Sequence, residues 1–293
     1  MKKQKIFSIV LFIFSISLLN ANIKVSTSTY PSAWEQNYIK QRSEIEKNTI
    51  KKLIDYHETE NDKLPTIAMV CSGGGCRAMI ATLGFLLGAQ EINLIDATRY
   101  ISVLSGSTWT TGILLALQKN NISNLREYLK NKMTTNLFDT NQLNNIDDIA
   151  KILFKKWSYN ENIQFSDVYG SVLISRLMED FNGEEQKFKF KNIRDYLNKN
   201  KYFPFPIFNT VIANQKPYQW LEINPFTTGC DYLGGFIPTS YFESKFENGE
   251  SIGKPYPEET LGSFLGLFGS AYSITSQDAD DHTDSEFIDG INK

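Results

Sequence analysis

The chain has 293 residues, of which 41% are hydrophobic and 22% are charged. These proportions are typical of a globular protein with a substantial core, and they exclude an intrinsically disordered chain. The formal net charge of −3 argues against a nucleic-acid partner and gives no general attraction to anionic lipid. The length fits one large domain, since no linker-like stretch of sequence favours two.

The first 21 residues have the pattern of a signal peptide. Lys2, Lys3 and Lys5 give a basic start, and residues 6–19 are an unbroken run of apolar residues and serines. This run is shorter than a membrane-spanning helix of about 20 residues. Cleavage after Ala21 predicts an exported protein, which is secreted, periplasmic or membrane-associated, and an uncleaved anchor is the alternative.

Residues 22–64 predict an N-terminal helical segment. Its large apolar side chains recur at approximately helical spacing: Trp34, Tyr38, Ile45, Ile50, Leu53 and Ile54. We expect this stripe to pack on the core of the domain that follows.

Residues 65–71 predict the first strand of that core, because this short apolar run begins with a proline and ends at glycines. Gly73, Gly74 and Gly75 then form a glycine loop. Apolar residues recur at helical spacing over residues 77–90, so a helix is expected to begin at the loop. The bare backbone N–H groups of such a loop can converge on an anion.

Residues 100–104 and 106–118 predict a second strand and a second helix, joined at Ser105. A serine at a sharp strand-to-helix turn holds its hydroxyl clear of the sheet. Both turns fall at the carboxyl ends of parallel strands, where open α/β sheets place their sites. Both helices also begin there, and their N-termini favour developing negative charge.

An oxyanion site beside an exposed serine is the arrangement that acyl transfer requires. The chain has two histidines. His57 precedes the first core strand among acidic residues, and His282 lies in a polar terminal stretch. A Ser-His-Asp triad is therefore poorly supported. The sequence favours a serine–aspartate dyad, in which a carboxylate takes the serine proton directly.

Three features lie outside this unit. Phe188 and Phe190 alternate with lysines and residues 202–213 are largely apolar, so both segments predict further strands. Residues 152–157 form an apolar cluster that we expect in the packed core, with contact to lipid as the alternative. The three cysteines, Cys71, Cys76 and Cys230, form no metal-binding pattern, so we predict no metal or cofactor.

In residues 72–79 and 104–109 the chain resembles the catalytic domain of cytosolic phospholipase A2 and fungal phospholipase B, which are relatives of patatin. Four later segments also resemble this family: residues 167–170, 220–225, 236–246 and 264–272. The resemblance implies an α/β fold with a parallel-sheet core flanked by helices. This catalytic domain would occupy residues 65–275 and be incomplete, residues 120–191 would form helices and a cap, and residues 276–293 would be a polar acidic tail.

The resemblance also implies roles for individual residues. Ser105 is the nucleophile that carries the acyl group, and Gly74 and Gly75 supply N–H groups to the oxyanion, with Gly73 giving the turn its freedom. Arg77 matches the family arginine that steadies the substrate phosphate, which suits a guanidinium. The implied substrate is a phospholipid or lysophospholipid ester at a membrane or micelle surface.

The chain departs from the family pattern at two places. Val103 occupies the position where the family elbow has a glycine, and a β-branched side chain is expected to crowd that turn. The family aspartate lies well after the block at residues 269–272, and this chain ends soon after that block. Asp289 is the one similar-looking candidate for the base.

Four alternatives stay open at this level. A truncated member without a base would be inactive and act, if at all, as a lipid-binding protein. Gly73, Gly75 and Ala78 also fit a dinucleotide-binding fingerprint. Ser105 could serve as an ordinary helix cap, and Arg77 could pair locally.

Overall fold

The computed structural model describes residues 23–27, 32–54, 64–117, 121–134, 146–158, 163–178, 188–212, 218–253 and 257–269. Within these residues a six-stranded sheet has the order β1-β2-β3-β4-β5-β6. The strands are β1 (Ile67–Cys71), β2 (Thr98–Leu104), β3 (Phe205–Ile212), β4 (Gln219–Ile223), β5 (Thr227–Cys230) and β6 (Gly235–Pro238). β1 to β3 are parallel, whereas β3 to β6 are antiparallel.

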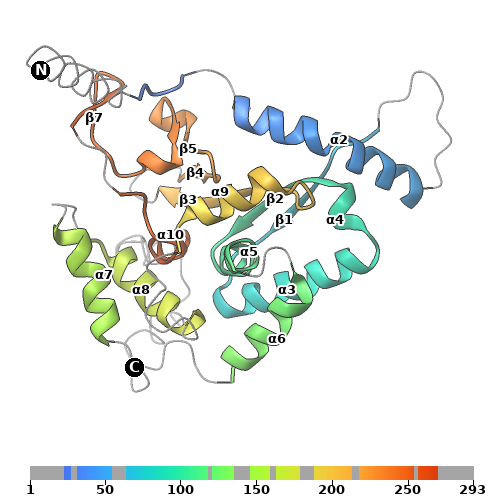
Figure 1. The fold of residues 1–293 in the computed structure, drawn as a ribbon, viewed down its shortest axis with the longest axis horizontal. Helices are drawn as coiled ribbons and strands as arrows, with labels where there is room; N and C mark the ends of the chain where they lie inside the picture. The colour runs from blue at the N-terminus through green and yellow to red at the C-terminus, as the bar shows by residue number, and fades with distance from the viewer. Residues whose placement is uncertain are drawn as a thin grey trace, which may run out of the picture.

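Helices cover both faces of this sheet (Figure 1). In the view of Figure 1, α2 (Ala33–Leu53) lies above the sheet, and α3 (Gly75–Glu91), α5 (Gly106–Ala116) and α10 (Leu261–Phe268) lie below it. The other described helices are α4 (Leu94–Ala97), α6 (Ile122–Lys132), α7 (Ile146–Ser158), α8 (Phe165–Leu177), α9 (Phe190–Lys199), η4 (Asp231–Leu233) and η5 (Thr239–Tyr241). A small hairpin is formed by β7 (Phe246–Glu247) and β8 (Glu250–Ser251). The predicted α/β class is confirmed.

The parallel half of the sheet arises from the two strand–turn–helix units that the sequence predicts. β1 and β2 overlap the predicted strands, and α3 and α5 begin at the glycine loop and directly after Ser105. Every residue of α5 from Gly106 to Leu115 is buried. An apolar helix of this kind belongs in the core, so α5 is a fixed element against which the site is built.

The buried side of α2 is charged rather than apolar. It consists of Glu35, Tyr38, Arg42, Glu46 and Ile50. Arg42 has no exposed surface, and its guanidinium donates to the carbonyl of Ile95 in α4 at 2.6 Å and to that of Thr98, the first residue of β2, at 3.1 Å. The predicted helix is confirmed, but its predicted stripe is wrong at Trp34, Leu53 and Ile54, which are exposed. The reason is that the buried carbonyls of Ile95 and Thr98 require hydrogen-bond donors, so α2 turns its Arg42 side toward the core.

One predicted strand is a helix in the structure. Phe190 begins α9, and Phe190, Ile193 and Leu197 are its buried residues. This spacing is helical, and it places the three side chains on the face that enters the core. The alternation of Phe188 and Phe190 with lysines was therefore misleading. The strand predicted over residues 202–213 is confirmed as β3.

Asn224 shapes the antiparallel half, which was not predicted. Its side-chain oxygen accepts the N–H groups of Phe226 at 2.9 Å and Thr227 at 2.8 Å. Its amide donates to the Thr227 hydroxyl at 2.9 Å. Asparagine favours such turns because its side chain bonds to backbone two or three residues on, so β4 returns as β5.

Closely packed glycines join α8 to α10. A Cβ atom on Gly170 would lie 2.2 Å from the carbonyl oxygen of Gly262, and one on Gly266 would lie 2.1 Å from that of Ser166. The indole of Trp109 donates to the Leu265 carbonyl at 3.3 Å and so joins α5 to α10. α8, α10 and α5 therefore form one packed layer beneath the sheet.

The apolar cluster at residues 152–157 is not packed as expected. Phe154 and Trp157 are 64% and 61% exposed, whereas Lys156 on the same helix is buried. The prediction of a packed core is wrong for these two aromatic residues, because ion pairs of Lys156 orient the helix.

Among the described residues, no helix is both long enough and apolar enough to cross a bilayer. Residues 1–21, predicted to be a signal peptide, and residues 276–293, predicted to be an acidic tail, lie outside the described part of the chain. The predicted domain boundaries and the cap over residues 120–191 stay predictions.

Candidate active site

Ser105 occupies a strained turn. β2 ends at Leu104 and α5 begins at Gly106, so Ser105 alone reverses the direction of the chain. Its backbone has φ 51° and ψ −125°, a combination that residues other than glycine rarely adopt. Strain of this kind costs of order 1–3 kcal/mol and persists where the surrounding structure enforces it. This is the geometry that a nucleophile elbow predicts.

The Ser105 hydroxyl does not cap α5. The backbone carbonyl of Ser105 accepts the Thr108 N–H at 2.8 Å and the Thr108 hydroxyl at 2.5 Å, while its side chain makes no capping hydrogen bond. The alternative of an ordinary helix cap is therefore wrong. Ser105 is half-buried, and its Oγ is not engaged by the helix that it precedes.

The glycine loop adopts conformations that favour glycine. Gly74 has φ 139° and Gly75 has φ 57°, both in regions that L side chains rarely occupy. Gly75 is the first residue of α3, and no side chain caps this helix. The first N–H groups of a helix have no partner within it, and they carry the positive end of its dipole. The loop is therefore suited to bind an anion.

The two turns are in direct contact. A Cβ atom on Gly73 would lie 3.1 Å from the Ser105 Cβ, and one on Gly106 would lie 1.9 Å from the carbonyl oxygen of Gly75. The N-termini of α3 and α5 consequently converge beside Ser105. This confirms the expectation that both turns meet at one edge of the sheet.

Buried hydroxyls lock α5 against α3. The Ser107 hydroxyl donates to the Ser72 carbonyl at 2.6 Å and accepts from the Thr82 hydroxyl at 2.8 Å. One turn further on, the Thr110 hydroxyl donates to the Met79 carbonyl at 2.7 Å. The sequence analysis missed these positioning residues. Their signal was the run of hydroxyl residues over positions 107–111 in an otherwise apolar helix.

Asn209 supports the strand that leads into Ser105. It lies on β3 opposite Leu104, and its amide donates to the Ser102 hydroxyl at 2.8 Å and the Val103 carbonyl at 3.3 Å. Val103, where the family elbow has a glycine, is fully buried in β2, and the expected crowding of the elbow stays a prediction. The sequence gave no specific signal for Asn209.

The cysteines near the site are unsuited to be nucleophiles. Cys71 and Cys76 flank the glycine loop as expected, and both are free thiols, as is Cys230. Burial raises the pKa of the Cys71 and Cys76 thiols, which keeps them protonated and weakly nucleophilic. Among the residues that the structure describes, no cluster of His, Cys, Asp or Glu could hold a metal ion.

Of the two remaining candidate residues, Arg77 lies within the described part of the chain and Asp289 does not. Arg77 is exposed in the first turn of α3, two residues after Gly75, and forms no ion pair with another described residue. Asp289 lies outside the described residues, as do His57 and His282. Within the described part of the chain, no hydrogen bond joins the Ser105 hydroxyl to a carboxylate. The identity of the base stays a prediction.

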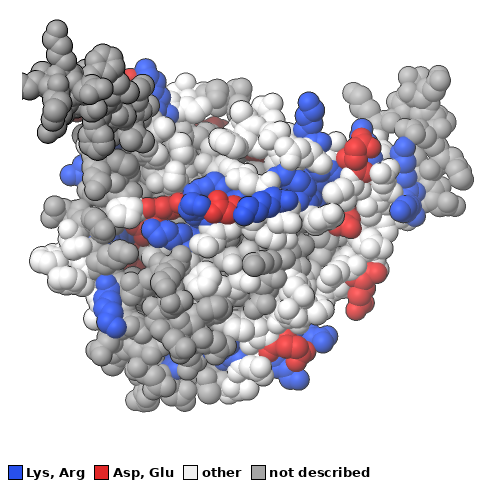
Figure 2. Space-filling view, viewed as in Figure 1, with Lys and Arg blue, Asp and Glu red and all other residues white. Residues whose placement is uncertain are grey.

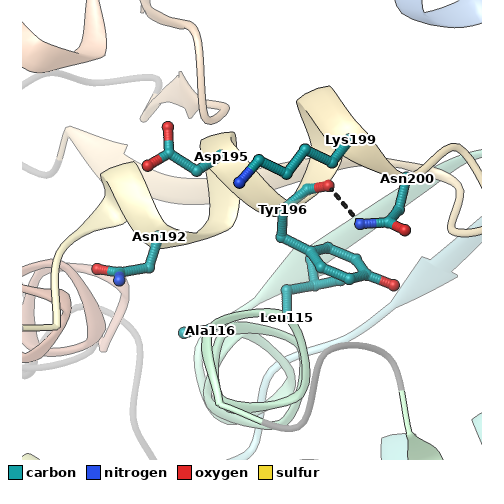
Figure 3. Close-up of a pocket in the computed structure, with 7 residues that line it drawn as sticks. All are labelled: Leu115, Ala116, Asn192, Asp195, Tyr196, Lys199 and Asn200. Atoms are coloured by element: carbon teal, nitrogen blue, oxygen red, sulfur yellow. Dashed lines mark hydrogen bonds between the residues drawn. The ribbon is translucent and has the colours of Figure 1, made fainter.

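A cavity of about 490 Å³ lies away from these residues (Figure 3). It is lined by Leu115 and Ala116 at the C-terminal end of α5 and by polar residues of α9, including Asn192, Asp195 and Lys199. The 11 residues of α5 span about 16 Å, so the cavity is at the opposite end of this helix from Ser105. It does not belong to the candidate site.

The fold and its paired turns define an α/β protein with an elbow serine beside a glycine loop. A family model described as the lysophospholipase catalytic domain matches residues 67–286. The match covers most of the chain, and the chain belongs to this family.

Curated relatives include cytosolic phospholipase A2 epsilon and cytosolic phospholipase A2 gamma, both of Mus musculus. They are each 30% identical to this chain, over 270 and 220 residues respectively. The matches cover 87% and 72% of this chain but 30% and 34% of the relatives. The chain thus spans about a third of the length of the curated relatives that it matches.

The fold is also found in solved structures. Human GIVD cytosolic phospholipase A2 superposes with a TM-score of 0.74 at 22% identity, over 86% of this chain and 34% of that chain. The predicted phospholipase A2 catalytic-domain architecture is therefore confirmed for the matched region.

The comparisons also correct one prediction. The relatives are cytosolic phospholipases A2 by name, which contradicts the prediction of an exported protein. The family match includes the glycine loop, so the alternative of a dinucleotide-binding protein is wrong.

Proposed function

We propose that the protein is a serine-dependent lipid acyl hydrolase, which cleaves fatty-acyl esters of phospholipids or lysophospholipids at a membrane or micelle surface. The observation that supports this most directly is the contact between the strained Ser105 turn and the glycine loop. Membership of the lysophospholipase family supports the class of substrate.

In the first half-reaction the Ser105 Oγ attacks the ester carbonyl carbon, and its proton passes to a carboxylate. The carbonyl oxygen becomes an oxyanion that accepts hydrogen bonds from the N–H groups of Gly74 and Gly75. One such donor contributes about 3–4 kcal/mol to stabilising the transition state. The converging N-termini of α3 and α5 add to this stabilisation.

The tetrahedral intermediate then collapses to acyl-Ser105, and the leaving alcohol takes the proton from the carboxyl group. Water hydrolyses the acyl-enzyme by the same steps and regenerates the serine. In this proposal Arg77, which is exposed beside the loop, binds the substrate phosphate through its fork of donors. Asp289 is the candidate for the base.

A second candidate is a catalytically inactive, lipid-binding member of the family. One observation favours it: no carboxylate of the described residues bonds to Ser105. The two proposals differ in whether Ser105 is reactive.

Covalent labelling by a fluorophosphonate distinguishes them. A solved structure of human GIVD cytosolic phospholipase A2 contains methyl gamma-linolenyl fluorophosphonate, so the probe suits this fold. We expect the wild type to be labelled and Ser105→Ala to be unlabelled. The matched control is Ser43→Ala, because the Ser43 hydroxyl donates within α2 to Lys40, away from the site, and this variant should label normally.

Asp289→Asn tests the base. Loss of labelling in this variant, with an unchanged circular dichroism spectrum, would support a Ser105–Asp289 dyad. A folded wild type that is not labelled would instead support the lipid-binding protein.

A further inference from the structure

α7 is oriented with a lysine toward the protein and aromatic rings toward solvent. Lys156 is 7% exposed, whereas Phe154 and Trp157 on the same helix are 64% and 61% exposed. A surface helix normally presents the reverse arrangement, with apolar residues facing the core and charged residues facing water. An inverted helix of this kind requires a physical cause.

The cause is a buried ion-pair cluster. The Lys156 ammonium lies 2.9 Å from the Asp167 carboxylate on α8, 2.8 Å from that of Glu243 after η5, and 3.6 Å from that of Glu259 before α10. A buried lysine is retained where it is paired, and removing it from its partners is strongly unfavourable. Rotating α7 to bury the aromatic rings would break all three pairs, so the cluster fixes the outward direction of the rings.

The outward side of α7 is aromatic with a basic residue beside it. The rings of Phe154 and Trp157 are neighbours, with centroids 5.5 Å apart. Lys151, three residues before Phe154, is exposed on this side, since residues three apart share a helix face. Figure 2 shows uncharged and basic side chains at the outer left edge, where α7 lies in Figure 1. We call Lys151, Phe154 and Trp157 the α7 aromatic face.

We propose that the α7 aromatic face docks on the headgroup region of a phospholipid bilayer. Tryptophan and phenylalanine side chains partition into this region, and a neighbouring lysine is attracted to lipid phosphates. This complementarity in charge and apolarity favours a lipid surface over a protein partner. The proposal rests on the proposed function in one respect, which is that the substrate is a lipid in a membrane or micelle.

The face belongs to the same packed unit as the candidate site. Lys156 joins α7 to α8, close glycine contacts join α8 to α10, and the Trp109 indole joins α10 to α5, which begins after Ser105. Docking through α7 therefore fixes the orientation of the whole helical layer relative to the bilayer.

Vesicle binding tests the proposal. The full chain is sedimented with phosphatidylcholine vesicles, with and without phosphatidylserine, beside the double variant Phe154→Ser/Trp157→Ser. We expect the double variant to bind vesicles at least about tenfold more weakly than the wild type. Two aromatic side chains are then no longer transferred from water into the bilayer. The matched control is Trp220→Ser, which removes a ring that is 59% exposed on β4 and should leave binding unchanged. Lys151→Glu should weaken binding to the anionic vesicles most.

Fluorescence gives a second, local readout. Brominated phosphatidylcholine should quench the tryptophan emission of the wild type, and Trp157→Phe should abolish most of that quenching while vesicles are still bound. Quenching that persists in Trp157→Phe would overturn the proposal.

Labelling by a soluble fluorophosphonate separates this proposal from the proposed function. A wild type that does not sediment with vesicles, or a double variant that binds them as the wild type does, overturns docking through α7 whatever the labelling shows. Vesicle binding that depends on Phe154 and Trp157 supports docking, and it does so even if Ser105 is never labelled and the hydrolase proposal fails. The double variant should retain the wild-type level of labelling, which also shows that it is folded.

Discussion

A Cβ atom added to Gly106 would lie 1.9 Å from the carbonyl oxygen of Gly75, so α3 and α5 begin in backbone contact. We predict that Gly106→Ala forces the two helices apart. The expected cost is about 1–3 kcal/mol in the free energy of unfolding, the usual penalty for overpacking. Because the glycine loop then moves away from Ser105, fluorophosphonate labelling should also slow. Urea unfolding and labelling rates measure the two effects.

Gly84→Ala is the matched control for this change. Gly84 is an exposed residue within α3, and a Cβ atom there would have no neighbour within 4 Å. Alanine at this position should stabilise the protein by about 0.5–1 kcal/mol, because the unfolded chain loses freedom and the helix gains propensity. Equal stability and equal labelling of Gly106→Ala and the wild type would contradict the close approach.

Ser107→Ala should weaken the attachment of the glycine loop to α5. The variant removes the donor to the Ser72 carbonyl and the acceptor for the Thr82 hydroxyl. We expect a loss of about 1–2 kcal/mol in the free energy of unfolding and slower labelling of Ser105. Thr82→Val should cost less, since it removes one of these two bonds.

A double-mutant cycle checks that Ser107 and Thr82 act together. The double variant Ser107→Ala/Thr82→Val should lose less free energy of unfolding than the sum of the losses in the two single variants, because the two hydroxyls share one hydrogen bond. Strict additivity would show that the two residues act independently and that the hydrogen bond contributes little.

The site could largely be predicted from local sequence. β1, the glycine loop, β2 and the Ser105 turn each have a signal within a few residues, because strand runs and positive-φ turns depend on local chemistry. Their contact followed from topology, since parallel neighbours end at one edge of a sheet. Asn209 could not be found in this way, because its role depends on the register of β3 against β2.

The elements that were mispredicted are those oriented by distant polar partners. α7 faces outward because Lys156 pairs with carboxylates from three other segments, and the buried side of α2 follows carbonyls near residues 95–98 and 201. A pattern of apolar residues assigns the apolar face to the core and contains no information on such partners. The prediction for α9 was wrong for a different reason. Phe188 and Phe190 fit the alternation of a strand, but Phe190 also fits the helical spacing of the buried residues of α9.

Arg42 is predicted to be essential for stability. Its guanidinium is fully buried and donates to the carbonyls of Ile95, Thr98 and Lys201. Arg42→Met should cost about 3–5 kcal/mol, because these carbonyls and the Glu46 carboxylate lose a buried partner. Arg42→Lys should rescue little, since an ammonium cannot reproduce the planar fork of donors.

The measurement is the free energy of unfolding in urea. Arg126→Lys is the control, because Arg126 is exposed on α6 and pairs with its neighbour Glu127. An Arg42→Lys protein as stable as the wild type would show that charge, and not the guanidinium geometry, is what α2 supplies.

Glu243 should give the protein a pH-dependent stability. Burial is the main cause that raises the pKa of its carboxyl above the ordinary value of 4.5, and the nearby Glu259 and Asp167 carboxylates add to it, against the opposing effect of Lys156. The folded protein therefore keeps a proton that the unfolded chain has lost. Stability contributed by this group is complete below about pH 4.5 and falls as the pH rises through the folded pKa.

Glu243→Gln removes this titration, and it should therefore change the slope of the free energy of unfolding against pH. The stability of the variant relative to the wild type should increase as the pH is raised above about 4.5 and through the folded pKa of Glu243, and should be constant below that range. The lost bond to Lys156 lowers the stability of the variant as a whole without reversing this trend. Urea unfolding across the pH range, with the exposed Glu247→Gln as control, measures it. Parallel curves for Glu243→Gln and the wild type would mean that Glu243 is ionised throughout and that Lys156 outweighs its burial.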